Sequence, residues 1–271
     1  MPYAWTQGFQ TYYEEHGKGF PVVLVHGHTF NATIWDEQVG PLAEHYGVIT
    51  YELRGHGRSD VPASGYWGSS YAEDLRQLLD HLGVEKAVLV GQAAGGSVVA
   101  NFYLRWPERV QCLAFAGAFL GGTLANEPGG DFQAAVRDLA RARGTRVAMD
   151  VLWQTRPMFE GARMRPAVFE RLRAMWTGFG GVLYLDRTPP PPQIPINERV
   201  GDFQVPTLFL YGDFTVKGVA EVAERARATA PQVECHLLPN TGPTLNIEEP
   251  TLFNRYLLDF LERTVDQARK E

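Results

Sequence analysis

Short, continuous apolar runs recur along the chain and are separated by segments whose apolar residues repeat every three to four positions. These runs occupy residues 21–25 (PVVLV), 48–53, 86–90 (KAVLV), 110–116, 207–211 (TLFLY) and 233–238. Unbroken apolar runs of this length are typical of parallel strands that are covered on both faces. An additional strand with aromatic content is expected at residues 9–15.

The intervening segments predict helices. Residues 70–82 (SYAEDLRQLLDHL) place apolar side chains at helical spacing after a serine that suits a helix N-terminus. Further helices are expected after Gly91 up to Trp106, at 219–229 and at 250–267. The alternation of strand and helix predicts an α/β fold whose mostly parallel sheet is wound by right-handed crossovers.

The regular alternation stops in the middle of the chain. Helical stretches at 132–143 and 167–176 follow glycine-rich turns, and four consecutive prolines, Pro189 to Pro192, form a stiff extended connector. The pattern predicts an α/β core made of 1–118 and 201–271, interrupted by a helical cap at 119–200.

Composition and charge narrow the classes of function. The chain has 271 residues, 45% of them hydrophobic, and a formal net charge of −6 without a basic stripe, which argues against nucleic acid or an anionic membrane as partner. The sequence contains no apolar run of about 18 residues, so no membrane span is expected. No signal-peptide pattern precedes the first strand. Cys112 and Cys235 lie in apolar, strand-like runs, which favours two buried thiols in a reducing, cytoplasmic compartment. Metal-binding spacing is absent, so no metal or cofactor is expected, and a homodimer is left open.

Five short motifs occur in a fixed order along the chain. They are His26-Gly27-His28 with Trp35 after it, residues 52–60 (ELRGHGRSD), residues 91–95 (GQAAG), residues 212–215 (GDFT), and Gly242-Pro243 followed by residues 248–250 (EEP). Together they resemble the α/β-hydrolase superfamily, in particular the capped group that contains epoxide hydrolases, cofactor-free haloperoxidases and C–C bond hydrolases. The resemblance covers most of the chain outside the cap and implies an α/β-hydrolase fold.

Residues 91–95 occupy the place of the nucleophile elbow in this resemblance. The elbow turns so sharply from strand to helix that small residues are needed two positions before and after the nucleophile, and Gly91 and Gly95 meet this need. The central residue is Ala93, whose methyl group cannot attack a substrate.

The other two positions of the implied Ser-His-Asp triad also differ from the family pattern. Thr215 stands where the acid is expected, with Asp213 left as a displaced alternative, and Pro243 stands where the histidine is expected. A hydroxyl cannot hold an imidazolium by charge, and proline has no titratable group. His236 lies in a predicted strand and is interpreted as structural. Ala93 alone would fit an engineered substitution, whereas three losses on three loops favour inheritance.

The oxyanion hole that the resemblance implies is formed by main-chain N–H groups and does not depend on side chains. By resemblance, the oxyanion hole uses the main-chain N–H groups of His28 and Ala94, and such donors contribute about 3 to 4 kcal/mol each at best. The imidazole of His28 is the candidate general acid or base. A loop histidine bonded to backbone is the alternative for His28, and both His26 and His56 are interpreted as structural.

Other side chains are candidates for ligand contacts. Gln92 is a further candidate catalytic residue, because its amide can both donate to and accept from a ligand, and Thr215 is a candidate for a hydrogen bond to a ligand. Aromatic residues Phe30, Trp153, Trp176 and Tyr184 are the candidate substrate-binding residues, since aromatic pockets suit planar apolar ligands. Packing within the cap core is the alternative for the aromatic residues of the cap, which also include Phe179.

Three hypotheses for function follow. The first is a non-hydrolytic enzyme that binds a hydrophobic carbonyl compound and promotes a cyclisation, isomerisation or lyase step, with a role in natural-product tailoring suggested by analogy. The second is a ligand-binding or regulatory pseudo-hydrolase. The third is an ester, epoxide or C–C hydrolase carrying an engineered Ala93, which Thr215 and Pro243 oppose.

Overall fold

The computed structural model describes residues 2–118, 120, 132–186, 188, 194–215 and 218–266. Within them, eight strands form one sheet in the order β1-β2-β4-β3-β5-β6-β7-β8. The strands are β1 (Tyr3–Thr6), β2 (Phe9–His16), β3 (Pro21–Val25), β4 (Gly47–Tyr51), β5 (Ala87–Gln92), β6 (Val110–Ala116), β7 (Thr207–Gly212) and β8 (Val233–Leu238). Strands β3 to β8 pair in parallel, while β1 and β2 are antiparallel at one edge. The predicted α/β architecture with a mostly parallel sheet is confirmed.

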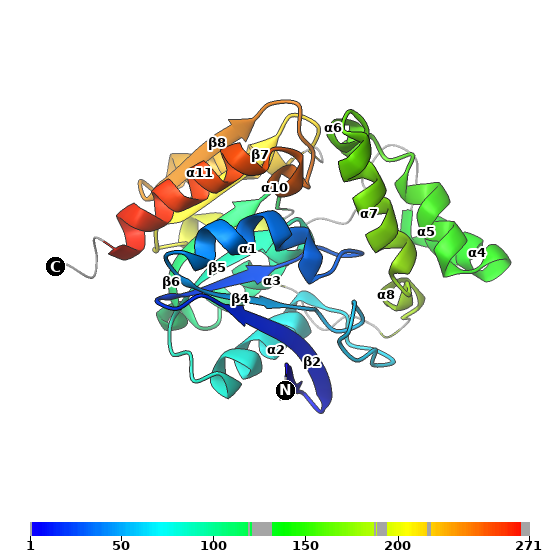
Figure 1. The fold of residues 1–271 in the computed structure, drawn as a ribbon, viewed down its shortest axis with the longest axis horizontal. Helices are drawn as coiled ribbons and strands as arrows, with labels where there is room; N and C mark the ends of the chain where they lie inside the picture. Colours follow the sequence, from blue (N-terminus) through cyan, green and yellow to red (C-terminus); the bar gives the residue numbers. More distant parts are fainter. Residues whose placement is uncertain are drawn as a thin grey trace.

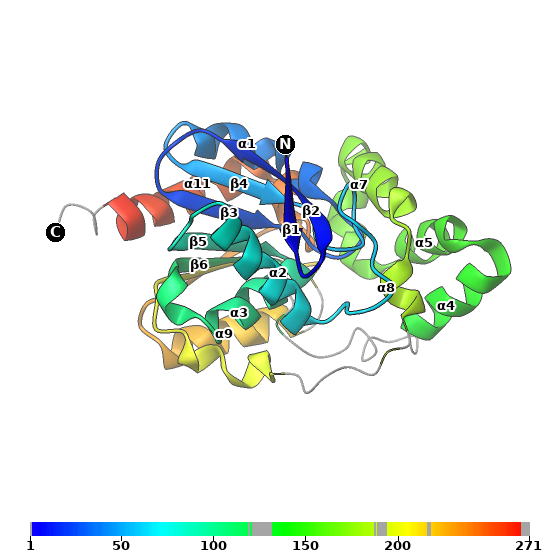
Figure 2. The same cartoon turned by 90° about the horizontal axis from the view of Figure 1, so that it is seen from below.

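Helices cover both faces of the sheet (Figures 1 and 2). One face carries α1 (Asp36–Ala43) and α11 (Pro250–Leu261), and the other carries α2 (Gly68–His81), α3 (Ala94–Tyr103) and α9 (Val219–Thr229). The short α10 (Leu245–Glu248) follows β8. Single turns of 3₁₀-helix are η1 (Ala32–Trp35), η2 (Pro107–Arg109), η4 (Pro157–Phe159), η5 (Ile196–Glu198) and η6 (Val200–Asp202), and the chain continues after α11 as the π-helical η7 (Glu262–Asp266).

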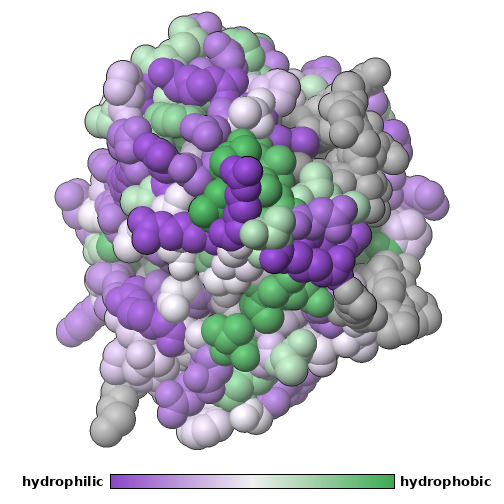
Figure 3. Space-filling model, turned by 90° about the vertical axis from the view of Figure 1, so that its right-hand side faces the viewer, coloured by the Kyte–Doolittle hydropathy of each residue, from purple (hydrophilic) through white to green (hydrophobic). Residues whose placement is uncertain are grey.

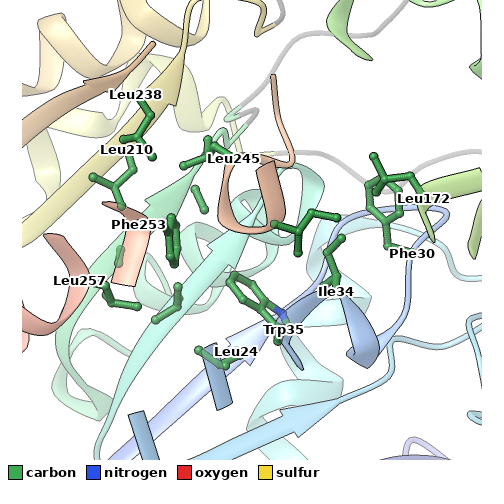
Figure 4. Packing of buried hydrophobic residues seen from close by; sticks show 14 of the residues in the cluster. Leu24, Phe30, Ile34, Trp35, Leu172, Leu210, Leu238, Leu245, Phe253 and Leu257 are labelled. Carbon is green, nitrogen blue, oxygen red and sulfur yellow. The ribbon is translucent and has the colours of Figure 1, made fainter. Parts of the chain in front are cut away.

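The core on the α1 and α11 face is built around a fully buried tryptophan (Figure 4). The rings of Trp35 and Phe253 lie 6.3 Å apart, and both residues pack beside Leu24 of β3 and Leu257 of α11. Burying side chains of this size stabilises the fold by about 1.5 to 3 kcal/mol each. This packing fixes the carboxyl ends of the strands, where the site lies.

In the described ranges, five helices lie together beside the sheet (Figures 1 and 2). They are α4 (Phe132–Arg143), α5 (Thr145–Trp153), α6 (Glu160–Arg163), α7 (Pro166–Gly178) and α8 (Val182–Leu185), and we call them the cap. Leu172 of α7 lies next to Phe30 of the core (Figure 4). The cap boundaries at 119 and 200 stay a prediction, and the Pro189–Pro192 connector lies outside the described residues.

The outward face of the cap mixes apolar and hydrophilic side chains, with apolar residues gathered near the middle of the view in Figure 3. Val147, Val151, Met164 and Leu185 are the large hydrophobic residues of the cap helices and their connections that are exposed. A homodimer stays a prediction. No helix in the described ranges is both long enough and apolar enough to cross a membrane.

Several predicted boundaries need correction. The helix expected up to Trp106 ends at Tyr103, and the helix expected to reach residue 267 ends at Leu261 before the π-helical turn. Residue 267 itself lies outside the described residues. Cys112 is buried as expected, but Cys235 is only half-buried because β8 is the edge strand of the sheet.

Candidate active site

The turn between β5 and α3 is the most strained backbone of the site. Ala93 adopts φ 47° and ψ −117°, a conformation that costs an alanine about 1 to 3 kcal/mol. A Cβ atom on Gly91 would lie 2.6 Å from the carbonyl oxygen of Gly95, and one on Gly95 would overlap the carbonyl oxygen of Val25. The glycines are therefore required by close packing, and the sharp elbow expected at residues 91–95 is present.

Gln92 connects the elbow to two other loops. Its side-chain oxygen accepts a hydrogen bond from the Gly27 main-chain N–H at 2.8 Å, and its side-chain nitrogen donates to the Pro243 carbonyl at 2.7 Å. The residue is fully buried. Since both ends of the amide are bonded within the protein, Gln92 holds the loops together, and its proposed bond to a ligand stays a prediction.

The loop after β3 packs directly against the elbow. A Cβ atom on Gly27 would lie 3.0 Å from the Cβ atom of Ala93. Thr29 adopts φ 70°, which is rare for a β-branched residue, and its buried hydroxyl has no hydrogen-bond partner among the described residues. Strain and an unpaired hydroxyl both occur at the loop that carries the predicted oxyanion donor.

Two neutral histidines hold this loop in place. His26 bonds the Gly27 carbonyl through Nδ1 at 2.8 Å and accepts from the Leu53 N–H through Nε2 at 3.0 Å. His56 accepts from the Thr29 N–H at 3.2 Å through Nε2 and bonds the Arg54 carbonyl through Nδ1 at 2.9 Å. In each ring the accepting Nε2 leaves the proton on Nδ1.

Burial keeps both of these rings uncharged. It lowers the pKa of His26 to about 4 and brings the pKa of His56 well below its ordinary value, and neighbouring imidazoles lower that of His56 further. With both nitrogens of each ring bonded to backbone, His26 and His56 have the structural role expected from the sequence.

His28 differs from its two neighbours. Neither ring nitrogen has a hydrogen-bond partner among the described residues, and the ring lies parallel to that of His56 at a centroid distance of 6.0 Å. Burial lowers the pKa of His28 to about 4, with a smaller contribution from His26. His28 nevertheless keeps accessible surface, as do Ala93 and Ala94.

The two predicted oxyanion donors are not used by the protein itself. In the described part of the chain, the main-chain N–H groups of His28 and Ala94 donate no hydrogen bond. Ala94 is the first residue of α3, where N–H groups have no acceptor within the helix. Both groups remain candidates for binding an oxygen atom.

The loop after β7 carries Thr215 and Asp213. The Thr215 hydroxyl donates to the Gly212 carbonyl at 2.7 Å. The Asp213 carboxylate accepts from the main-chain N–H groups of Asn240 and Thr241 at 3.0 and 3.1 Å. Asp213 therefore joins the loops after β7 and β8, an arrangement that favours its structural alternative over a displaced acid.

The loop after β8 brings Pro243 to the centre of the sheet, against Gly117 at the end of β6. Glu248 supports the loop by accepting from the Gly242 N–H at 3.0 Å and the Thr244 hydroxyl at 2.6 Å. Burial raises the pKa of Glu248 despite these bonds. No three or more His, Cys, Asp or Glu residues of the described chain come close enough together to hold a metal ion.

The predicted substrate-binding aromatics lie in different surroundings. Trp176 is fully buried and, with Trp153, packs on Phe159 at 5.2 and 5.4 Å, so their ligand contacts remain untested beside the cap-packing alternative. The ring of Tyr184 lies edge-on to that of Phe179, with 6.2 Å between the ring centroids.

The cap and the core meet at aromatic contacts. Phe30 and Phe179 line a small cleft of about 80 Å³ between them. Phe179 also stacks on His56 at 4.6 Å, so a cap residue touches the histidine that bonds the Thr29 N–H.

Sequence reasoning missed Tyr71, which lies next to the site, and a second buried tyrosine, Tyr51. Tyr71 of α2 lies 5.7 Å from His28 between ring centroids, and Tyr51 ends β4. Both are buried, and neither phenol oxygen has a hydrogen-bond partner in the described structure. An apolar helical face and a strand pattern predict core positions, so the sequence held no signal for a polar role.

Known proteins resemble the chain along nearly all of its length. The family model for the alpha/beta hydrolase fold matches residues 21–250. An uncharacterized carboxylesterase of Bacillus subtilis (strain 168) is 28% identical over 262 residues, covering 92% of this chain and 81% of that protein. The solved structure of an N-acyl homoserine lactone degrading enzyme has a TM-score of 0.80 at 28% identity and covers 96% of this chain and 100% of its own. The enol-lactonase from Burkholderia xenovorans LB400, with a TM-score of 0.82 at 20% identity and coverage of 96% and 99%, supports the fold alone.

Proposed function

Because the chain belongs to the alpha/beta hydrolase fold family but has Ala93 at the elbow, we propose that it acts on a small hydrophobic carbonyl compound without forming an acyl-enzyme. The reaction class is a proton-transfer step of the kind used in isomerisation, cyclisation or carbon–carbon cleavage. No cofactor is needed for this chemistry.

The methyl group of Ala93 is the observation that carries the proposal. It occupies the strained position at which a nucleophile would sit, and Gln92 ties the adjacent Pro243 loop to the elbow. Loss of one triad member lowers turnover by about 10⁴ to 10⁶. Ala93, Thr215 and Pro243 together leave no covalent route.

The relatives are named as hydrolases, and their names support one part of the proposal. Carboxylesterases and lactone-degrading enzymes act on carbonyl compounds, which agrees with a carbonyl ligand here. Hydrolysis is not carried over to this chain because the side chains at the elbow and at the loops after β7 and β8 do not support it.

The proposed step uses two backbone donors and one imidazole. The N–H groups of His28 and Ala94 bind the carbonyl oxygen. A proton from the adjacent carbon passes to a ring nitrogen of His28 while the electron pair of the C–H bond shifts to form the enolate. The reverse transfer returns a proton to the same or another carbon. His28 is neutral at pH 7 because its pKa is about 4, so its nitrogen is available to accept.

A ligand-binding protein is the second candidate, favoured by the same low pKa of His28, since an imidazole of pKa about 4 is a weak base. Binding without turnover separates it from the enzyme.

Two measurements test the proposal. 4-(Dimethylamino)cinnamaldehyde absorbs at longer wavelength when its carbonyl accepts hydrogen bonds, so we expect a red shift on binding. Proton NMR in D₂O then follows α-proton exchange of 2-tetralone, which we expect at least about tenfold above the buffer rate, a modest effect for general base catalysis. His28→Phe, which keeps a ring in place, should retain the red shift and lose the exchange.

The outcomes separate the candidates. A red shift with exchange only at the buffer rate favours the ligand-binding protein. A stoichiometric burst of p-nitrophenol from p-nitrophenyl acetate would restore the hydrolase interpretation and overturn the proposal.

A further inference from the structure

The proposed chemistry leaves three buried hydroxyls unused. The phenol oxygens of Tyr71 and Tyr51 and the hydroxyl of Thr29 have no hydrogen-bond partner among the described residues. Tyr66, which lies 6.5 Å from Tyr71, contrasts with them because its hydroxyl donates to the Pro62 carbonyl. A buried hydroxyl without a partner is costly, so each of these groups requires an explanation.

Tyr71 is the one that lies beside the candidate active site. Its ring is 5.7 Å from that of His28, whose nitrogens are also unbonded in the described structure. Burial, followed by the neighbouring phenol of Tyr66, the carboxylate of Asp74 and the phenol of Tyr184, raises the pKa of Tyr71 well above its ordinary value against the opposing effect of Arg54. The phenol is therefore protonated and can donate.

We propose that Tyr71 and His28 form a subsite for a second, uncharged oxygen of the ligand. The inference rests on the proposed function, in which the first oxygen binds the main-chain N–H groups of His28 and Ala94. Since both subsites include His28, the two oxygens lie a few bonds apart, as in a 1,3-dicarbonyl or a β-hydroxy carbonyl compound. The ligand class is thus an apolar carbonyl compound with a neighbouring ketone, enol or hydroxyl group.

The charges around the subsite exclude a carboxylate. His28 is neutral, and Arg54, the cation that lowers the pKa of Tyr71, is bonded to both oxygens of Asp74 at 2.6 and 2.7 Å. A buried carboxylate would lack a counter-charge, whereas a neutral oxygen needs only the phenol and imidazole donors.

Two ketones that differ by one oxygen test the inference. Calorimetry compares 1-phenylbutane-1,3-dione with 1-phenylbutan-1-one, and we expect the diketone to bind at least about tenfold more tightly, as one well-placed hydrogen bond provides. 4-Oxo-4-phenylbutanoate, which carries a carboxylate, should bind no better than the monoketone.

Tyr71→Phe removes only the hydroxyl. We expect it to abolish the preference for the diketone while the monoketone binds as before, and to leave the unfolding transition unchanged or raise it. Tyr51→Phe is the matched control, because it removes another buried phenol without a hydrogen-bond partner in the described structure, one that lies on β4 rather than on α2. It should change neither affinity.

Equal binding of the two ketones overturns the subsite and leaves the proposed function standing. Binding of neither ketone counts against both. A fall in stability on Tyr71→Phe, or the same loss of preference on Tyr51→Phe, also contradicts the inference, because the phenol would then have a structural partner or the effect would not be local.

Discussion

The side-chain nitrogen of Gln92 donates a hydrogen bond to the main-chain carbonyl of Pro243, a residue 151 positions away, at 2.7 Å. The oxygen of the same amide accepts from the Gly27 N–H. A single buried side chain thus joins the loops after β3, β5 and β8. These are the loops that carry the proposed oxyanion donors and Pro243, which stands where the resemblance places the family histidine.

Gln92→Leu should lower the free energy of unfolding by about 2 to 4 kcal/mol, because it leaves a buried N–H and a buried carbonyl without partners. Urea denaturation at pH 7 measures this change. The same variant should reduce the red shift of the bound cinnamaldehyde, because Gly27 is adjacent to His28 in the oxyanion loop.

Gln204→Leu is the control for that substitution. Gln204 is exposed, and replacing a surface glutamine should change stability by no more than about 0.5 kcal/mol. If Gln92→Leu changed the free energy of unfolding as little as Gln204→Leu, the hydrogen bonds of Gln92 with Pro243 and Gly27, at 2.7 and 2.8 Å, would not stabilise the fold.

Ala93→Ser alone should not create an esterase. A serine at the elbow needs a base and an acid to become a nucleophile, and the sequence resemblance predicts that Pro243 and Thr215 stand at their positions. We expect p-nitrophenyl acetate hydrolysis to stay at the background rate for Ala93→Ser. It should rise at least about tenfold when Pro243→His and Thr215→Asp are added.

The decisive comparison is between the single and the triple variant under matched protein concentration, with circular dichroism to check folding. Hydrolysis by Ala93→Ser alone would mean that His28 or another imidazole reaches residue 93, and the argument from the three losses would fail.

The sequence predicted the parallel strands closely, for a physical reason. The bounds of Pro21–Val25 and Val110–Ala116 agree with the structure because strands covered on both faces need uninterrupted apolar runs. Strand β1 and helix α1 were missed. The first has only four residues with alternating burial, and the second contains Pro41 and buries only Gln38 and Leu42.

Local motifs and long-range contacts were not equally predictable at the site. The strained elbow at Ala93 follows from spacing of glycines in five consecutive residues. The hydrogen bonds of Gln92 and the contact of Tyr71 with His28 depend on how segments far apart in the sequence pack together. The spacing of residues in a single sequence does not predict such contacts. For the same reason the packing of Trp176 within the cap was left as an alternative.

Acid should destabilise the fold through the buried imidazoles of His26, His28 and His56. The folded-state pKa values of His26 and His28 are lowered to about 4, and that of His56 is also lowered, against about 6.5 in the unfolded chain. Their effect on stability is absent above pH 6.5. Below pH 6.5 these imidazoles are protonated in the unfolded state and stay neutral in the folded state. The free energy of unfolding therefore falls between pH 6.5 and 4 by up to about 1.4 kcal/mol per pH unit for each group.

Urea unfolding at pH 7, 6 and 5 measures this slope. His28→Phe should reduce the slope of the free energy of unfolding against pH by the contribution of one titrating group. No other loss is expected, because neither ring nitrogen of His28 has a hydrogen bond in the described structure. A slope that His28→Phe leaves unchanged would show that His28 takes up a proton in the folded state.

The stacking of Phe179 on His56 should couple the cap to the oxyanion loop. Their centroids are 4.6 Å apart, and His56 accepts from the Thr29 N–H. Phe179→Ala exposes the imidazole, so the pKa of His56 should rise towards its ordinary value, which NMR titration of the histidine C–H signals reports. The red shift of the bound cinnamaldehyde should shrink as the loop loses support.

Phe169→Ala distinguishes coupling from a general weakening of the cap. Phe169 contacts Trp176 at 5.5 Å within the cap, away from His56. Both variants should lower the stability of the cap, since truncating a packed phenylalanine costs about 3 to 5 kcal/mol when it is fully buried. Only Phe179→Ala should move the His56 titration, because Phe179 stacks on that ring whereas Phe169 packs on Trp176. An equal shift in both variants would mean that the cap protects the histidine as a whole rather than through this one contact.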